Sequence, residues 1–216
     1  VSNGTAVLGL GDIGPLAGKP VMEGKGVLFK TFADIDVFDL ELDTRDPDRF
    51  VETVQMLEPT FGGINLKDIK APEGLSIYER LCNTMGIPVF HENLYSSAVV
   101  ATAALINALE LAGKRTAEIR VVICGAGTVG IGCARLFLRL GVRPENLLIY
   151  DIRGLIHPDR NDLFDCQRDL ARKHPASSLP DGVRGADVLV GASSGAVFTL
   201  EMLRSFGIGY GQGYLF

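Results

Sequence analysis

The sequence lacks several features that mark specialised classes of protein. Its 216 residues contain no internal repeat, no low-complexity tract and no block of like charges. Basic residues do not predominate, since the formal charge is −5 and the pI is near 5.2, so neither nucleic acid nor an anionic membrane is expected as the main partner. No charged segment followed by an apolar run opens the chain. We therefore expect a cytoplasmic protein whose partners are small molecules or proteins.

Cysteine and long apolar runs are also scarce. The four cysteines have no CxxC spacing, and Cys124 and Cys133 fall in apolar stretches, so we expect all four to be reduced and structural. The longest apolar stretch, residues 98–113, is interrupted by Asn107 and Glu110. It is shorter than the roughly 20 residues that a membrane span needs. It predicts a buried helix of a soluble protein.

The composition is typical of a globular α/β protein, with 47% apolar residues, 22% charged residues and 26 glycines. Short β-rich runs alternate with runs of helical spacing, which predicts βαβ units and a largely parallel sheet. Asp46 followed by Pro47 predicts the start of a helix over residues 50–57. The expected strands are residues 6–10, 35–38, 87–90, 119–123, 147–150 and 188–191.

A long helix over residues 98–111, closed by Gly113, separates two expected subdomains that share it. We place the boundary near residue 95. The expected domains are residues 1–95 and residues 96–216, the second of them a Rossmann-type nucleotide-binding domain.

An apolar strand that runs into the glycine pattern G-x-G-x-x-G predicts a dinucleotide site in the second domain. Gly125 permits the tight turn, Gly127 lets a pyrophosphate approach the backbone, and Gly130 lets the following helix pack on the strand. The helix N-terminus offers amides and a positive dipole end to the phosphates. The alternative interpretation is a glycine-rich structural turn without a ligand. The expected cofactor-binding residues are Gly125, Ala126, Gly127, Thr128, Val129, Gly130, Asp151 and Arg153.

The residues after the next strand favour NAD as the cofactor. Asp151 ends that strand, where a carboxylate accepts hydrogen bonds from a ribose diol and repels a 2′-phosphate. Arg153 lies two residues further on and could pair with that phosphate, so NADP stays open.

Several longer segments resemble malic enzymes of the bacterial type. These are VSNGTAVLGLGDIGPLAGKPVMEGKGVLFKTFADIDVFDLELD, LEPTFGGINLKDIKAPE, IPVFHENLYSSA, GAGTVGIG and GADVLVGASSGAVFT, and the similarity runs from Val1 to about Phe206. The resemblance implies oxidation of L-malate with NAD(P), followed by decarboxylation to pyruvate and carbon dioxide, with Mg²⁺ or Mn²⁺ as the second cofactor. It implies that the first domain binds substrate and metal. It also implies that Lys25, in PVMEGK, is the base that removes the hydroxyl proton.

The expected metal site departs from the family pattern, which has Glu-Asp before the I-K-A-P element and Asp-Asp after the strand ending in Phe-His. This chain has Lys67-Asp68 and Glu92-Asn93 at those places. Only Asp68 is unchanged, and Asn93 and Glu92 complete the expected donor set. Because Mg²⁺ and Mn²⁺ prefer anionic oxygen ligands, a site beside an ammonium group is expected to bind them weakly.

The helix entry after Asn93 differs from the family as well. Ser96 and Ser97 are expected to cap the helix, and Tyr95 is expected to pack. The family also places a catalytic tyrosine upstream of VSNGT and substrate-binding asparagines downstream, so an incomplete substrate site is expected. The Gly- and Tyr-rich tail from residue 207 carries no assignment.

The remaining polar residues favour structural roles. His91 is expected to pack at a strand end, and His157 and His174 to lie in exposed loops. The charged clusters at residues 43–46 and 159–162 are expected to be solvated turns.

Two functions therefore stay open. The first is a malic enzyme-like oxidoreductase that forms at most a weak homodimer. The second is a non-catalytic NAD(P)-binding or assembly module derived from a malic enzyme. A fragment of a longer protein, or an artificial recombination of family sequence, also fits.

Overall fold

The computed structural model of the chain describes residues 1–193 and 198–205. The chain forms two compact units, Val1–Asn93 and Leu94–Phe216, which are described separately. Because residues 194–197 are not among those described, the structure covers the GADVLVGASSGAVFT segment only in part. The Gly- and Tyr-rich tail lies outside the described residues.

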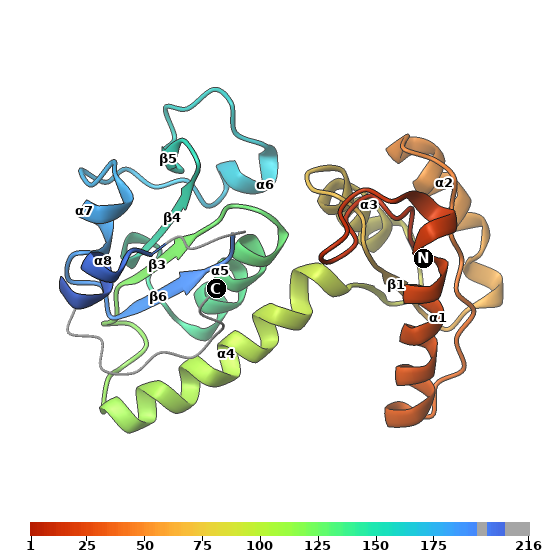
Figure 1. Cartoon of the computed structure of the whole chain (residues 1–216), viewed down its shortest axis with the longest axis horizontal. Coiled ribbons are helices and arrows are strands. Elements are labelled where there is room, and N and C mark those ends of the chain that lie inside the picture. Colours follow the sequence, from red (N-terminus) through yellow and green to blue (C-terminus); the bar gives the residue numbers. More distant parts are fainter. Residues whose placement is uncertain (194–197, 206–216) are drawn as a thin grey trace. The chain divides into compact units, whose positions relative to one another are not determined.

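The first unit combines helices with a small parallel sheet (Figure 1). Strands β1 and β2 pair in parallel, with Leu66 opposite His91. The elements are α1 (Gly14–Ala33), α2 (Pro47–Met56), the 3₁₀ turn η1 (Glu58–Thr60), β1 (Ile64–Leu66), α3 (Glu73–Thr84) and β2 (Val89–His91).

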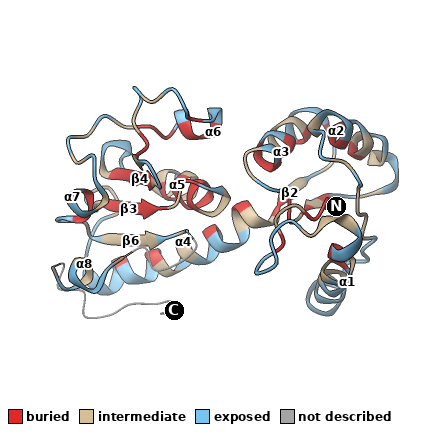
Figure 2. Ribbon diagram, turned by 45° about the horizontal axis from the view of Figure 1, so that its top comes forward, coloured by how far each residue is buried: buried red, intermediate tan, exposed pale blue. Residues whose placement is uncertain are grey.

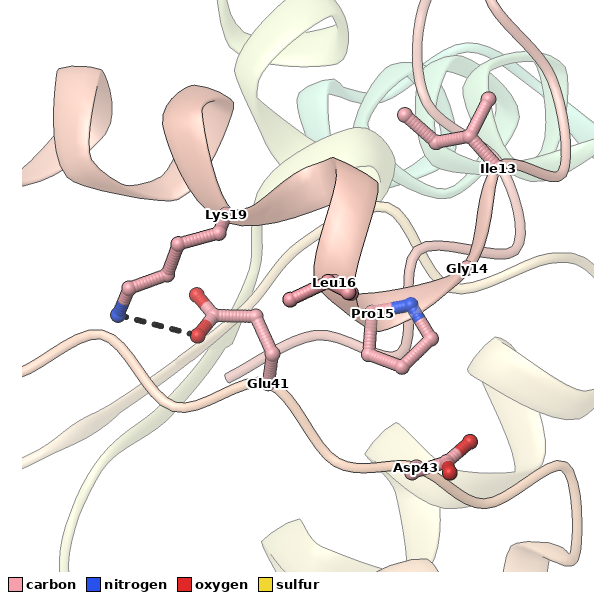
Figure 3. Close-up of a pocket in the computed structure, with 7 residues that line it drawn as sticks. All are labelled: Ile13, Gly14, Pro15, Leu16, Lys19, Glu41 and Asp43. Carbon is pink, nitrogen blue, oxygen red and sulfur yellow. Dashed lines mark ion pairs between the residues drawn. The ribbon is translucent and has the colours of Figure 1, made fainter.

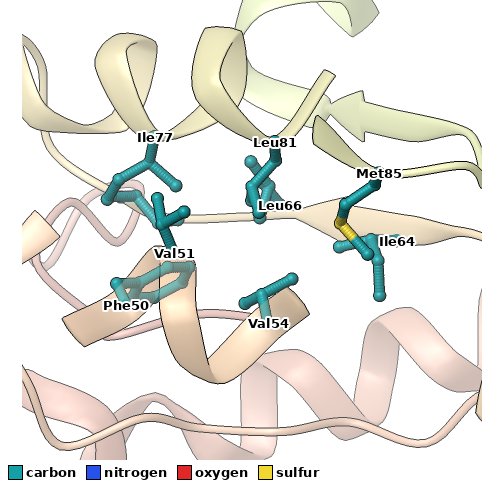
Figure 4. Packing of buried hydrophobic residues seen from close by; sticks show 9 residues of the cluster. Phe50, Val51, Val54, Ile64, Leu66, Ile77, Leu81 and Met85 are labelled. Carbon is teal, nitrogen blue, oxygen red and sulfur yellow. The ribbon is translucent and has the colours of Figure 1, made fainter. Parts of the chain in front are cut away.

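The core of the first unit lies between α2, β1 and α3, as Figure 4 shows. Helix α2 begins as expected, because the Asp46 side chain accepts a hydrogen bond from the Asp48 amide at 2.9 Å and Pro47 follows it. Helical spacing then turns the apolar residues of α2 to one face. The buried side chains are Phe50, Val51, Val54, Ile64, Leu66, Ile69, Ile77, Leu81 and Met85.

Two expected strands of the first unit are wrong. Residues 6–10 form a turn, because Gly4, Gly9 and Gly11 adopt positive φ and only an isolated bridge between Val7 and Gly11 remains. Residues 35–38 form no strand, and the Phe38 side chain is 72% exposed. Both runs contain residues that favour strands, but among the described residues neither run has a neighbouring strand with which it pairs.

The third expected strand of this unit is shorter and begins later than the sequence indicates. It covers Val89–His91 rather than residues 87–90. The long helix α1 was not anticipated, since its glycines and its internal Pro20 disfavour a helix interior.

The second unit is a four-stranded sheet with helices (Figure 1). Its elements are most of α4 (Glu92–Ala112), then β3 (Val121–Cys124), α5 (Thr128–Leu140), the 3₁₀ turn η2 (Pro144–Asn146), β4 (Leu147–Asp151), β5 (Gly154–Leu155), α6 (Asp165–Arg168), α7 (Leu179–Val183), β6 (Val188–Gly191) and α8 (Leu200–Ser205).

The strand order β5-β4-β3-β6 makes β3 the centre of the sheet. Strand β3 is parallel to both β4 and β6, whereas the short β5 is antiparallel to β4. The chain therefore moves from β3 to one side and later returns to the other side. Ligands of open α/β sheets bind at such a switch point, beyond the carboxyl ends of the strands. The expected α/β class with parallel sheets is confirmed.

The central strands of the second unit are buried, as Figure 2 shows for β3 and β4. One face of the sheet packs Val122, Leu148 and Tyr150 against Val183. The Tyr150 hydroxyl donates a hydrogen bond to the Ala176 carbonyl at 2.8 Å, and burial raises its pKa to about 12. The expected burial of Cys124 and Cys133 is confirmed, and the four cysteines are free thiols.

Helix α4 corrects two expectations. It begins at Glu92, so Ser96 and Ser97 lie inside the helix and do not cap it. It is also mostly exposed: Val100 is 67% and Leu111 90% exposed, and Figure 2 shows pale blue along most of its length.

The buried residues of α4 form a narrow stripe of Leu94, Ala98, Leu105 and Leu109. At 21 residues, α4 is, among the described residues, the one helix long and apolar enough to cross a membrane by length and composition alone. Its first half packs on α5, where a Cβ at Gly132 would overlap the Leu94 carbonyl.

The core of the first unit predicts a large effect of truncation at Phe50. This side chain is fully buried, so Phe50→Ala should lower the free energy of unfolding of the first unit by about 3–5 kcal/mol. Urea unfolding followed by circular dichroism measures the loss. Met56→Ala on the same helix is the control, because Met56 is 76% exposed and should change stability by less than about 0.5 kcal/mol. Equal effects of the two changes would contradict this core.

Candidate functional site

The parallel pairing of β1 and β2 gathers the charged residues of the first unit at one edge of its sheet. Lys67 and Asp68 follow β1, and Glu92 and Asn93 follow β2. The carboxyl ends of parallel strands lie side by side, which brings these four residues together although about 25 residues separate them in sequence. The expected metal residues Asp68, Glu92 and Asn93 thus share one site.

Lysine side chains already compensate the carboxylates at this edge. Lys67 Nζ lies 3.4 Å from Asp68 Oδ1 and 3.4 Å from Glu92 Oε1. Lys25, on α1, reaches the same Glu92 oxygen at 3.2 Å. Two cations and two carboxylates therefore form a network without net charge, most of it shielded from solvent, since the Lys67 and Glu92 side chains are 13% and 16% exposed.

The donor set does not fit a divalent cation. The Lys67 ammonium contacts both carboxylates that would have to hold such a cation, and it would repel a second positive charge. The Asn93 amide oxygen accepts a hydrogen bond from the Asp68 amide at 3.2 Å. Among the described residues, no group of three or more His, Cys, Asp or Glu side chains could hold a metal.

Asp68 is held in a specific backbone conformation. Its side chain is buried and its φ of +56° lies in the left-handed region, which non-glycine residues seldom adopt. The Asp68 carbonyl accepts a hydrogen bond from the Ala6 amide at 3.0 Å. The loop that replaces the expected first strand thus holds the backbone of Asp68 in place.

His91 packs at the end of β2, as expected. It is fully buried, its ring lies edge-on to Tyr78 with centroids 5.9 Å apart, and burial lowers its pKa to about 4. His157 and His174 lie in loops as expected, although both are only partly exposed. Tyr95 is half-buried on α4.

The second site lies where β3 turns into α5. Gly125 has a φ of +118°, and a Cβ there would overlap the Ala192 carbonyl beyond β6. A Cβ at Gly130 would overlap the Gly125 carbonyl. By contrast, a Cβ at Gly127 would meet no atom within 4 Å. The backbone is therefore packed tightly at both ends of the turn and open at its middle.

The open part of the turn coincides with the first turn of α5. Gly127 is the N-terminal boundary residue of α5, and it makes no side-chain cap. Thr128 and Val129 are half-buried beside it. The first amides of a helix have no partner within the helix, so they can bind an anion that approaches over Gly127.

Asp151 lies close to this turn at the end of β4, and Arg153 follows it in the turn between β4 and β5. The pairing of Cys124 with Tyr150 and the hydrogen bond from the Gly125 amide to the Tyr150 carbonyl, at 2.7 Å, place Asp151 beside the glycine turn. Asp151 is not free, because Arg160 donates to both of its oxygens at 2.9 and 2.7 Å. Arg153 pairs with Asp162 at 2.9 Å.

Two residues of this site, Arg160 and Gln167, were not expected from the sequence. Arg160 was expected in a solvated turn, yet its side chain is only 16% exposed. Gln167 is buried and donates to the Ala126 carbonyl at 3.0 Å, which fixes the glycine turn. A charged residue among other charges and a single glutamine give no pattern by which these contacts could be predicted.

A pocket in the first unit lies apart from the expected site residues. Figure 3 shows it at the start of α1, where Lys19 points towards Glu41. Lys19 Nζ lies 3.1 Å from Glu41 and 2.7 Å from Asp39. This pocket contains none of the residues expected to act in catalysis.

Comparison with known proteins covers both units. The family profile of the malic enzyme N-terminal domain matches residues 1–82, and that of the malic enzyme NAD binding domain matches residues 94–207. An NAD-dependent malic enzyme of Rhizobium meliloti is 52% identical over 94% of this chain, and an NADP-dependent malic enzyme of Escherichia coli is 48% identical over 94%. This chain spans 26% and 27% of those two proteins, about a quarter of their length.

A solved structure supports the same likeness. The NAD-dependent malic enzyme of Thermotoga maritima has a TM-score of 0.86 and 41% identity, over 94% of this chain and 55% of that one.

The contacts of Lys67 with Asp68 and Glu92 predict that substitutions at this site can increase its affinity for a divalent metal. Replacing Lys67 by Glu together with Asn93→Asp removes the internal cation and adds two carboxylates, so Mn²⁺ affinity should rise by at least about tenfold. Electron paramagnetic resonance of free Mn²⁺ measures the affinity. Lys70→Glu, on an exposed neighbouring residue, makes the same change of charge as Lys67→Glu alone and should have little effect. Tight Mn²⁺ binding by the unaltered chain would contradict the proposed role of Lys67.

Proposed function

The chain belongs to the malic enzyme family, and on that premise we propose that it supplies the cofactor site and the proton acceptor of an NAD(P)-dependent oxidoreductase. The proposed reaction converts L-malate and NAD(P)⁺ to pyruvate, carbon dioxide and NAD(P)H. The observation that carries this proposal is the β3–α5 turn, where the backbone is packed at Gly125 and Gly130 but open at Gly127.

The glycine turn binds the pyrophosphate in this proposal. The cofactor, when bound, accepts a hydride from C2 of malate. The α5 amides hold the negative charge over Gly127, and the buried Gln167 keeps the turn in place through the Ala126 carbonyl. Asp151, at the end of β4, favours NAD over NADP because a 2′-phosphate would meet its carboxylate.

Lys25 is the proposed proton acceptor. Its side chain projects from α1, is 26% exposed, and lies 3.2 Å from Glu92. The Lys25 ammonium first gives its own proton to solvent, and the neutral amine then takes the hydroxyl proton of malate as the hydride leaves C2, so that no negative charge builds up on the C2 oxygen. The partial burial of Lys25 and its contact with Glu92 fix the position of the amine.

The contacts of Lys67 at the expected metal site favour a second candidate function. The Lys67 ammonium contacts the Asp68 and Glu92 carboxylates, at which Mg²⁺ or Mn²⁺ would have to bind. A module that binds NAD(P) without turnover accounts for this substitution. Turnover of malate above a buffer blank, with metal and both cofactors supplied, distinguishes the first candidate from the second.

A homodimer and a cytoplasmic location complete the proposal. Helix α1 exposes large apolar side chains, with Leu16 89% and Phe32 83% exposed, which a second chain could cover. The four free thiols are compatible with a reducing compartment.

The open turn predicts the effect of a methyl group at residue 127. Gly127→Ala should leave the fold intact, because the new Cβ meets no protein atom, but it should weaken NADH binding by about tenfold or more by filling the space of the pyrophosphate. NADH fluorescence titration measures the dissociation constant. Gly24→Ala, at an equally open position on α1, is the control. Unchanged affinity in Gly127→Ala would place the pyrophosphate elsewhere.

The role of Lys25 predicts a loss of turnover without a loss of cofactor binding. In the active protein, Lys25→Met should lower malate-dependent NAD(P)H formation by at least about 100-fold. NADH affinity should not change, since the proposed pyrophosphate site is formed by the glycine turn and the first amides of α5, to which Lys25 does not belong. Lys30→Met, on the same helix and 56% exposed, is the matched control. Retention of the full rate by Lys25→Met would exclude it as the base.

A further inference from the structure

Four charged side chains form a closed network beyond β4. Arg160 donates from Nη1 and Nη2 to the two oxygens of Asp151, at 2.9 and 2.7 Å. It donates from Nε and Nη2 to Asp162, at 3.0 and 2.7 Å. Arg153 pairs with Asp162 at 2.9 Å. Two arginines and two aspartates leave this network without net charge.

Arg160 is the residue that holds the network together. Its side chain is 16% exposed, and it makes a further hydrogen bond to the Leu155 carbonyl at 3.2 Å. Its hydrogen bonds hold the pKa of Asp162 well below the usual range. A guanidinium forms two parallel hydrogen bonds to a carboxylate. An ammonium group cannot reproduce this bidentate geometry.

Asp151 is thereby largely satisfied and neutralised. Oδ1 accepts from Arg160 and, at 2.8 Å, from the Arg153 amide, and Oδ2 accepts from Arg160. A carboxylate in this state is a poorer acceptor for a ribose diol than a free one. It also repels a phosphate less, because the guanidinium charge lies within hydrogen-bond distance of it.

We propose that Arg160 is a specificity-determining residue of the cofactor site, which keeps NADP acceptable by neutralising Asp151. This inference rests on the cofactor site proposed above. Arg153, whose side chain is 66% exposed, is placed to turn from Asp162 towards a 2′-phosphate. In this proposal Asp151 makes the affinity for NAD higher than that for NADP, and Arg160 keeps the difference between the two affinities small.

The test compares the affinities for NADH and NADPH in variants of the full chain. Arg160→Gln should raise the dissociation constant of NADPH by about tenfold or more, while that of NADH stays the same or falls, because an unpaired Asp151 repels only the 2′-phosphate. The difference should shrink at high salt. Arg160→Lys keeps the charge and should recover part of the NADPH affinity.

A double variant separates the charge from the architecture. Adding Asp151→Asn to Arg160→Gln removes the uncompensated carboxylate and should restore NADPH binding towards that of the unaltered chain. Arg115→Gln removes an arginine that is 80% exposed and pairs with Glu118, so it should change neither affinity. Circular dichroism melting of each variant checks that the second unit is folded.

Two results would contradict different parts of this proposal. Weakening of NADH and NADPH by the same factor in Arg160→Gln would overturn the proposal and leave Arg160 a purely structural role. Failure of the unaltered chain to bind either dinucleotide would instead overturn the cofactor site itself, and this inference with it.

Discussion

The close approach of the backbone at Gly125 and Gly130 is the contact on which the second unit depends. Strand β3 can lead directly into α5 because no side chain stands between the Gly125 carbonyl and the helix, or between Gly125 and the chain leaving β6. The same packing brings β4 alongside, so that Asp151 ends beside the turn. A tightly packed turn thereby leaves an open stretch of backbone at Gly127, where we propose that the pyrophosphate binds.

Both candidate sites compensate their carboxylates with the chain's own cations. In the first unit Lys67 and Lys25 contact Glu92, and in the second unit Arg160 binds Asp151 on both oxygens. Burying a carboxylate is costly unless it is paired, so these contacts stabilise the edges of the two sheets. They also change the ligand chemistry. We propose that the first site therefore binds a divalent metal weakly, and that the second repels a phosphate less than an unpaired carboxylate would.

The sequence was most informative where a local pattern has one physical solution. The Asp46-Pro47 cap, the β3–α5 glycine pattern and the buried strand β4 follow from capping, glycine conformation and apolar runs. The strands expected at residues 6–10 and 35–38 failed because a strand needs a partner, and no local signal reports one. The long exposed face of α4 was missed because apolar composition alone does not tell burial from exposure.

Some residues of the candidate sites could also be predicted from the sequence, and others could not. The grouping of Asp68, Glu92 and Asn93 was expected from the family resemblance, and the parallel pairing of β1 and β2 gives its physical cause. Arg160 and Gln167 act through contacts across loops, which no spacing in the sequence encodes. Residues of this kind are found only when the three-dimensional partners are known.

Hydrogen–deuterium exchange with mass spectrometry, in the presence and absence of saturating NADH, tests the central claim most directly. We predict slower exchange on NADH binding in peptides covering residues 124–131 and 150–153, with no change in peptides covering residues 64–84 of the first unit. Unchanged exchange at the β3–α5 turn, with NADH demonstrably bound, would contradict it.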